Sequence, residues 1–403
     1  MGVAVLRLAA EAIEFAAMDI FDIEKREGFM RRGLLLVCLV SVIGLAVWGL
    51  PAEITTWQLA ADSFPANLRW MSDGNLYVSL QNPRGIALFE PAANRLGVWE
   101  TAEAPGEFEL INSRIFFAQP HVGELGWLNL DFGMMAFYSI PSASAWPVML
   151  LDGGAAPGDV DIWYVDWSNG NVGLFAPIES GPFDHRDLVP NNITATRASY
   201  GVEPSVQQVA GTTHFADPSL VPAVASAISV KNDPFTEWAL FSPAAPTFGF
   251  TRSDDGRIWV SGAAGDPLQA LSPWDDTVTL YDLPGDPFVM GLAAASGNRL
   301  WYLATTPNES AVTLGVLNVI TGDATVWTIP DAGDPLSLRV VGDKVWFTDR
   351  WISAIYRFDP ATSSFTWWLS GADDAPMALE PGVDGEMWIS YERTGAIARL
   401  VFE

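Results

Sequence analysis

Gly342-Asp343-Lys344-Val345-Trp346-Phe347-Thr348-Asp349 runs from a tight turn through a hydrophobic residue into an aromatic one. Glycine beside a short polar residue suits such a turn, and the alternating residues that follow suit a buried β-strand. Six more copies occur along the chain, and their aromatic residues are Tyr77, Phe116, Trp163, Trp259, Trp301 and Trp388. Most successive copies are 39 to 47 residues apart. A turn-and-strand unit with this period is typical of the blades of a β-propeller.

The number of blades follows from the spacing. The interval between Trp163 and Trp259 is 96 residues, and a degenerate copy at 211–217 divides it into steps of 51 and 45 residues. A second repeat, an alternating aromatic-rich strand that closes each unit, also occurs eight times, for example at 185–190 and 235–240. We therefore predict an all-β fold, a β-propeller of eight four-stranded blades, and we expect the tryptophans at repeat positions to pack between blades.

The two ends of the repeat region predict how the ring closes. Residues 54–59 form an outer strand with no unit before it, and the last unit ends at 396–402, one strand short. Pairing the two would remove two exposed strand edges that invite aggregation. We expect the N-terminal strand to complete the C-terminal blade.

Three segments are expected along the chain. Residues 1–29 are an N-terminal extension, and a translation start at Met30 is the alternative that makes this segment a mis-assigned start. Residues 30–52 begin with Met30-Arg31-Arg32, continue into an apolar run at 33–50, and are typical of a signal peptide or an uncleaved signal anchor. The basic residues favour a cytoplasmic N-terminus. The propeller at 53–403 would then be secreted, periplasmic, or anchored to the membrane only through residues 33–50.

Composition excludes some partners. The net charge of −27 argues against nucleic acids and anionic membrane surfaces. The only cysteine, Cys38, lies in the apolar run, so the propeller region has neither a disulfide nor thiol chemistry. A peptide, a glycan or a protein remains as the ligand.

The C-terminal repeats resemble a known family. Residues 342–349 with 354–362, and 384–390 with 394–400, resemble the repeats of the streptogramin lyase (virginiamycin B lyase-like) propellers. The resemblance spans residues 52–403 and implies four-stranded blades with a site at the mouth of the central channel. Family members are usually seven-bladed, so seven blades is the alternative to eight. The resemblance also implies a lyase that uses Mg²⁺ and a histidine base to open a cyclic depsipeptide by elimination. No histidine and glutamate pair matches that catalytic set, and no catalytic residue is transferred to this chain.

Carboxylates recur near the end of the repeat strand. Three positions after the repeat aromatic, the residues include Asp166, Asp217 and Asp349. If these side chains converged at one rim of the channel, they would offer the oxygen ligands that Mg²⁺ or Ca²⁺ prefers. The alternative is that each aspartate caps the turn that follows its strand.

Neighbouring side chains predict a ligand site on the same rim. Arginine and aromatic groups beside carboxylates can hold a peptide, a sugar or an anion, and the candidate residues are Asp166, Trp167, Arg350, Trp351, Tyr391 and Arg393. His121 is the candidate base if the protein is an enzyme, and a hydrogen-bonded loop histidine is the alternative.

Three functions remain open from the sequence. The first is an extracytoplasmic binding or scaffolding module with its ligand site at the channel rim. The second is a metal-assisted lyase like the streptogramin lyases. The third is a membrane-anchored structural component of the cell envelope.

Overall fold

The computed structural model describes residues 53–402, except 60–61, 72–73, 94, 112, 132, 143, 154–160, 177–228, 233–234, 241–248, 263–264, 306–310, 371–373 and 384. The chain divides into two units, Met1–Pro51 and Ala52–Glu403, and all of these residues belong to the second. The predicted extension at 1–29 and the predicted signal segment at 30–52 lie outside the described residues. Within the described part, no helix is long and apolar enough to cross a membrane.

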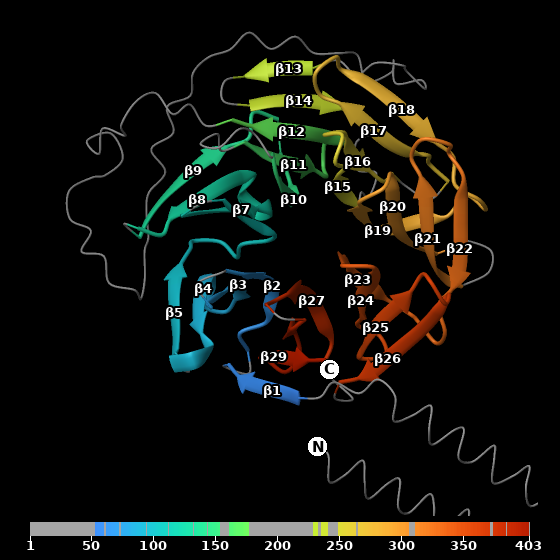
Figure 1. The fold of residues 1–403 in the computed structure, drawn as a ribbon. Coiled ribbons are helices and arrows are strands. Elements are labelled where there is room, and N and C mark those ends of the chain that lie inside the picture. The colour runs from blue at the N-terminus through green and yellow to red at the C-terminus, as the bar shows by residue number, and fades with distance from the viewer. Residues whose placement is uncertain are drawn as a thin grey trace, which may run out of the picture. The chain divides into compact units, whose positions relative to one another are not determined.

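The described residues of the second unit form an all-β propeller of seven blades arranged around a common axis (Figure 1). Each blade is an antiparallel sheet whose strands follow one another outward from the axis. Blade 1 contains β2 (Pro65–Trp70), β3 (Leu76–Gln81), β4 (Arg84–Glu90) and β5 (Arg95–Glu100). Blade 2 contains β6 (Phe108–Ile111), β7 (Arg114–Gln119), β8 (Glu124–Asn129) and β9 (Met134–Ser139).

Blades 4 to 6 repeat this order, and blade 3 has a fifth strand at its outer edge. Blade 3 contains β10 (Pro147–Asp152), β11 (Ile162–Asp166), β12 (Asn171–Phe175), β14 (Phe235–Ala239) and, outermost, β13 (Ser229–Asn232). Blade 4 contains β15 (Phe250–Arg252), β16 (Ile258–Val260), β17 (Leu268–Ser272) and β18 (Thr277–Tyr281). Blade 5 contains β19 (Phe288–Ala295), β20 (Arg299–Thr305), β21 (Val312–Asn318) and β22 (Ala324–Thr328). Blade 6 contains β23 (Pro335–Val341), β24 (Lys344–Asp349), β25 (Ala354–Asp359) and β26 (Ser364–Leu369).

Blade 7 closes the ring with strands from both ends of the repeat region. It contains β27 (Pro376–Pro381), β28 (Met387–Tyr391), β29 (Ala396–Val401) and β1 (Glu53–Gln58). β1 pairs antiparallel with β29, with Trp57 opposite Ile397 and Thr55 opposite Arg399. The expected pairing of the N-terminal strand with the C-terminal blade is confirmed.

The prediction of eight blades is wrong, because the described residues form seven. β12 pairs directly with β14, with Val172 opposite Trp238, so residues 235–239 complete blade 3 instead of closing a further blade. The degenerate copy at 211–217 and the expected strand at 185–190 lie outside the described residues. The extra length between Trp163 and Trp259 therefore interrupts one blade between its third and fourth strands.

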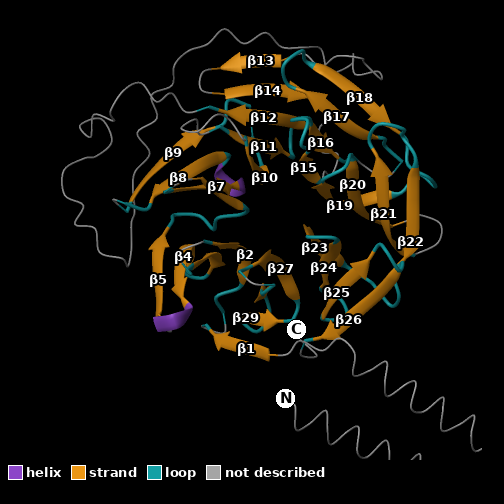
Figure 2. Ribbon diagram, viewed as in Figure 1, coloured by secondary structure: helices purple, strands orange, loops and turns teal. Residues whose placement is uncertain are grey.

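The core lies between neighbouring blades. The repeat aromatics are buried, and clusters of apolar side chains join each blade to the next. At the junction of blades 7 and 1, Trp388 stacks on Trp57 and Trp70, with ring centroids 5.3 and 5.0 Å apart. The prediction that repeat tryptophans pack between blades is confirmed. Among the described residues the only helical segments are two 3₁₀ turns, η1 (Pro91–Ala93) and η2 (Pro120–Val122) (Figure 2).

Candidate functional site

The second strand of several blades ends at the residue that the sequence predicted. β7 ends at Gln119, β11 at Asp166, β24 at Asp349 and β28 at Tyr391. Because the blades share one topology, these strand ends lie at the same face of the propeller, which we call the strand-end face. The loops that lead into the innermost strands reach the same face, since first and second strands are antiparallel.

Asp166 is fully buried and its carboxylate is occupied by hydrogen bonds. Oδ1 accepts from the backbone N–H of Trp146 at 2.8 Å and from the Ser168 hydroxyl at 3.0 Å. Oδ2 accepts from the side chain of Asn169 at 2.6 Å. Asp166 therefore fastens the loop before β10 and the turn after β11 to the end of its strand.

Asp349 does the same in blade 6. It is fully buried, and Oδ2 accepts from the backbone N–H of Gly333 at 2.7 Å and of Asp334 at 3.3 Å. Oδ1 accepts from the N–H groups of Trp351 and Ile352 at 2.9 and 3.1 Å. The turn-capping alternative thus describes both aspartates. Asp217 lies outside the described residues, and within those residues no three His, Cys, Asp or Glu side chains come together with metal-binding geometry.

Arg350 and Trp351 follow Asp349 on the strand-end face. Arg350 is tied to the loop before β23, because its Nε donates to Asp334 at 2.8 Å and its Nη1 lies 3.9 Å from Glu392 of blade 7. Trp351 is 78% exposed, and its ring lies against the backbone at Gly333. Arg350 therefore bridges two blades, while Trp351 presents its ring to solvent.

Tyr391 and Arg393 differ in their surroundings although they are close in sequence. Tyr391 is buried in the core between blades 6 and 7, and burial raises the pKa of its hydroxyl above the usual range. Arg393 is exposed in the turn before β29. Of this pair, only Arg393 has a side chain at the surface of the strand-end face.

Trp167 and His121 come together around a residue that sequence reasoning missed, Trp146. The rings of His121 and Trp146 meet edge to face with centroids 4.8 Å apart, and those of Trp146 and Trp167 lie 6.3 Å apart. His121 and Trp146 line a groove of about 470 Å³ between blades 2 and 3, together with Ser139, Ser142 and Ser144. We call it the His121–Trp146 groove.

Local backbone geometry forms one wall of the groove. Pro120 begins η2 after β7, and Gly123 ends it in the left-handed conformation (φ 68°) that glycine accommodates best. A side chain at Gly123 would lie 2.9 Å from the carbonyl oxygen of Ala145, so glycine lets the turn that bears His121 lie close to the loop before β10. The Gly123 carbonyl also accepts from Ile140 at 3.0 Å.

A buried carboxylate holds the other wall. Ser142 donates to both oxygens of Glu237 on β14, at 2.8 and 2.7 Å, and Tyr164 donates to Oε1 at 3.0 Å. Glu237 is 8% exposed, and burial raises its pKa although these hydrogen bonds act in the opposite direction. Tyr164 can reach Glu237 because Gly173 stands between them in the register, and a Cβ there would overlap the tyrosine ring. The sequence signal that could have found this site is Glu237, a charged residue within the aromatic-rich strand at 235–239.

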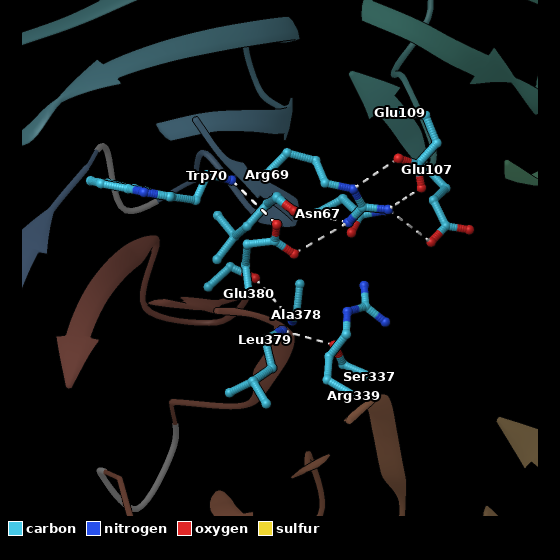
Figure 3. A network of polar contacts seen from close by, with 12 residues as sticks. Asn67, Arg69, Trp70, Glu107, Glu109, Ser337, Arg339, Ala378, Leu379 and Glu380 are labelled. Carbon is cyan, nitrogen blue, oxygen red and sulfur yellow. Dashed lines mark hydrogen bonds and ion pairs between the residues drawn. The ribbon is translucent and has the colours of Figure 1, made fainter. Parts of the chain in front are cut away.

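A second polar cluster lies on the innermost strands (Figure 3). Arg69 of β2 donates to Glu109 of β6 through Nη2 at 2.6 Å and Nε at 3.3 Å. Its Nη1 lies 3.8 Å from Glu380 of β27, and its Nη2 lies 3.9 Å from Glu107. Arg69 therefore connects blade 1 to both of its neighbours.

The β-sheet register explains this cluster. In four consecutive blades the residue that faces the repeat aromatic across the first strand pair is charged, and the signs alternate around the ring: Arg339 faces Trp346, Glu380 faces Trp388, Arg69 faces Tyr77 and Glu109 faces Phe116. Burial raises the pKa of Glu107 and Glu380. The carboxylates, with Glu109 foremost, outweigh burial and raise the pKa of Arg69, whereas burial and the charge of Arg69 lower that of Arg339.

Comparisons with known proteins show the fold. No family model matches the chain, and no curated protein matches it in sequence. Among solved structures it is similar to a streptogramin B lyase, with a TM-score of 0.64 and 14% identity over 87% of this chain and 98% of that one. It is similar to virginiamycin B lyase from Staphylococcus aureus, with a TM-score of 0.64 and 13% identity over 87% and 99% of the two chains.

A third neighbour is the extracellular domain of a putative hybrid two-component system from B. thetaiotaomicron, with a TM-score of 0.57 and 14% identity over 86% of this chain and 42% of that one. At such low identity, likeness to solved structures shows a common fold and nothing about activity. The resemblance seen in the sequence is therefore supported as a resemblance of propeller fold, and not as membership of the lyase family.

Proposed function

We propose that the chain is an extracytoplasmic binding module whose ligand occupies the His121–Trp146 groove on the strand-end face. The observation that carries the proposal is the groove itself, about 470 Å³ in volume and lined by two aromatic rings and three serines. Ligand sites combine this kind of concave, partly aromatic surface with a few fixed polar groups. Loops held by a rigid scaffold are where binding residues collect.

The way the groove is held supports binding without a large rearrangement. Its walls are fastened to blade 3 by Asp166, which bonds Trp146, and by Glu237, which bonds Ser142. Both carboxylates are buried, and neither belongs to the groove lining. A preformed site of this kind loses little conformational entropy when a ligand binds.

The location outside the cytoplasm rests on two observations. The apolar segment at 33–50 with basic residues before it is typical of export signals, and some structural neighbours are extracellular domains. Fractionation of cells that express the full chain, with protease added to intact cells, tests this location. Protection of the propeller until the cytoplasmic membrane is broken would contradict it.

Binding is tested by screening peptides and oligosaccharides against the full chain and a Trp146→Ala variant. A ligand of the groove should bind the unaltered chain and lose at least about tenfold in affinity with the variant. Circular dichroism and thermal unfolding of the variant provide the control for folding. Ligands that bind both proteins equally would place the site elsewhere and contradict the proposal.

A further inference from the structure

Two of the three serine hydroxyls in the His121–Trp146 groove, those of Ser139 and Ser142, donate their hydrogens to carboxylates. Ser142 donates to Glu237 at 2.7 Å, and Ser139 donates to Glu124 at 3.2 Å. A hydroxyl has one hydrogen to donate and two lone pairs that accept. Asn171 donates to Ser142 at 3.2 Å and occupies one of those lone pairs. Ser139 and Ser142 can therefore accept a hydrogen bond from a ligand, but their hydrogens are already used.

The backbone around the groove has the same bias. The N–H groups of Gly123, Ile140, Ala145 and Trp146 are already bonded within the protein, to Gln119, Gly123, Ser142 and Asp166 respectively. Pro120 has no N–H group. The carbonyl of Ser144 accepts from Ser168 at 2.6 Å and keeps a second lone pair. At Ser139, Ser142 and the Ser144 carbonyl, a ligand in the groove thus meets hydrogen-bond acceptors.

Charge adds a second requirement. Glu124 and Glu237 accept hydrogen bonds from the two serines and make the serine oxygens more negative, and the whole chain carries a net charge of −27. The half-buried ring of Trp146 supplies an aromatic surface that attracts cations through its electron-rich face. An anionic ligand would be repelled here. A cationic hydrogen-bond donor would be favoured by the acceptor groups, by the negative charge and by the aromatic ring.

We propose that the groove recognises a cationic hydrogen-bond donor, namely an ammonium group such as a lysine side chain of a peptide. The inference rests on the proposed binding function and names its ligand class. Ser139 and Ser142 would accept from the ammonium group, and Trp146 would flank its aliphatic stem. Because the recognised group is charged, affinity should fall as salt concentration rises.

Calorimetry with the full chain and three small probes tests the inference. The probes are an acetyl-Gly-Lys-Gly amide, the same peptide with its lysine side chain acetylated, and a neutral trisaccharide of glucose. At about pH 8 the lysine peptide should bind at least about tenfold more tightly than its acetylated form. Trp146→Ala should abolish that binding, whereas Trp274→Ala, a change at a 64% exposed tryptophan outside the groove, should not alter it.

Two further variants report on the carboxylates. Glu124→Gln and Glu237→Gln should each weaken binding of the lysine peptide about fivefold or more, and Glu124→Gln keeps the test valid if Glu237→Gln folds poorly. Equal affinity for the lysine and acetyl-lysine peptides would overturn the inference. Binding of the trisaccharide, lost with Trp146→Ala, in the absence of lysine-peptide binding would also overturn it, while leaving the groove as a binding site. Lysine-peptide binding with the same affinity in Trp146→Ala as in the unaltered chain would contradict the proposed function as well.

Discussion

Arg69 and Glu109 form a two-point ion pair across the boundary between blades 1 and 2, and both side chains are less than one-fifth exposed. The same guanidinium lies within 4 Å of Glu380 on blade 7. Arg69 of blade 1 therefore balances carboxylates from both neighbouring blades, 2 and 7. A partly buried charge network stays favourable only while each charge keeps its partner.

Replacing Arg69 with leucine should destabilise the propeller strongly. The change leaves three carboxylates, Glu107, Glu109 and Glu380, with the single positive charge of Arg339 near them and little water, and breaking such a network costs about 3–5 kcal/mol. Urea unfolding of the Arg69→Leu variant should show a loss of this order near neutral pH. The loss should shrink in acid, because protonation removes the unpaired negative charges.

The matched control is Arg393→Leu, a change at an exposed arginine in the turn before β29. It should change the free energy of unfolding by no more than about 0.5 kcal/mol. A similar effect of both substitutions would show that the Arg69 network contributes nothing specific.

Trp57 should be the residue on which ring closure depends most. It lies on β1, stacks on Trp388 of blade 7 and meets Phe89 of blade 1 edge to face at 5.4 Å. Trp57→Ala should cost about 3 kcal/mol, typical of truncating a large packed aromatic. Hydrogen exchange of β1 and β29 should report the loss first, because their pairing joins the ends of the repeat region. Unchanged exchange in both strands would contradict the closing role.

Two tyrosines at equivalent positions give a direct measure of the Glu237 hydrogen bond. Tyr164 faces Gly173 and then Glu237, whereas Tyr302 faces Gly315 and then Val326. The buried hydroxyl of Tyr302 has no hydrogen-bond partner among the described residues, and burial raises its pKa to about 12. Tyr164→Phe should cost about 1–2 kcal/mol, because it removes a bond to a buried carboxylate.

Tyr302→Phe should be neutral or slightly stabilising, since it removes a buried polar group that is not satisfied. Thermal unfolding of the two variants side by side tests the contrast. Equal losses would show that ring packing, and not the bond to Glu237, accounts for the effect at Tyr164.

The repeat aromatics could be predicted because they recur locally with a fixed period. The pairing of β1 with β29 could be predicted because the repeat region begins with one extra strand and its last unit is one strand short. The number of blades could not, because β12 and β14 pair across residues 176–234, and the local alternation does not show that this long segment interrupts a blade. The degenerate copy at 211–217 was counted as an eighth blade only because it lies at the expected spacing from its neighbours.

The candidate site was predictable in part for a related reason. Asp166, Trp167 and His121 lie at ends of repeat strands, so their position on one face follows from the period. Trp146 lies in a loop between blades, and its neighbours come from a different blade. Their meeting depends on how the blades pack, which the pattern within one repeat does not contain.

Stability should depend on pH through Glu237. Burial raises its pKa above the ordinary glutamate value of 4.5, so the folded state binds more protons than the unfolded state above that pH. The free energy of unfolding should therefore fall as pH rises from about 4.5 until it passes the raised pKa. Glu237→Gln should flatten this dependence, and Glu107 and Glu380 should account for the slope that remains. Urea unfolding between about pH 4 and pH 8 measures the profile, and identical slopes for both proteins would contradict the prediction.

Substitution of Asp349 distinguishes between a turn-capping role and a metal-binding role for this residue. Its carboxylate accepts four backbone hydrogen bonds from two loops, so Asp349→Ala should leave several N–H groups unsatisfied and cost about 2–4 kcal/mol. A capping role predicts the same loss in Mg²⁺, in Ca²⁺ and in a chelator. A cation site predicts that the divalent ion stabilises the unaltered protein and that Asp349→Ala removes this gain, because binding to the folded state alone raises its stability. Thermal unfolding of both proteins with and without chelator decides between them. We expect no response to the ion in either protein, since each oxygen of Asp349 is already held by two N–H groups.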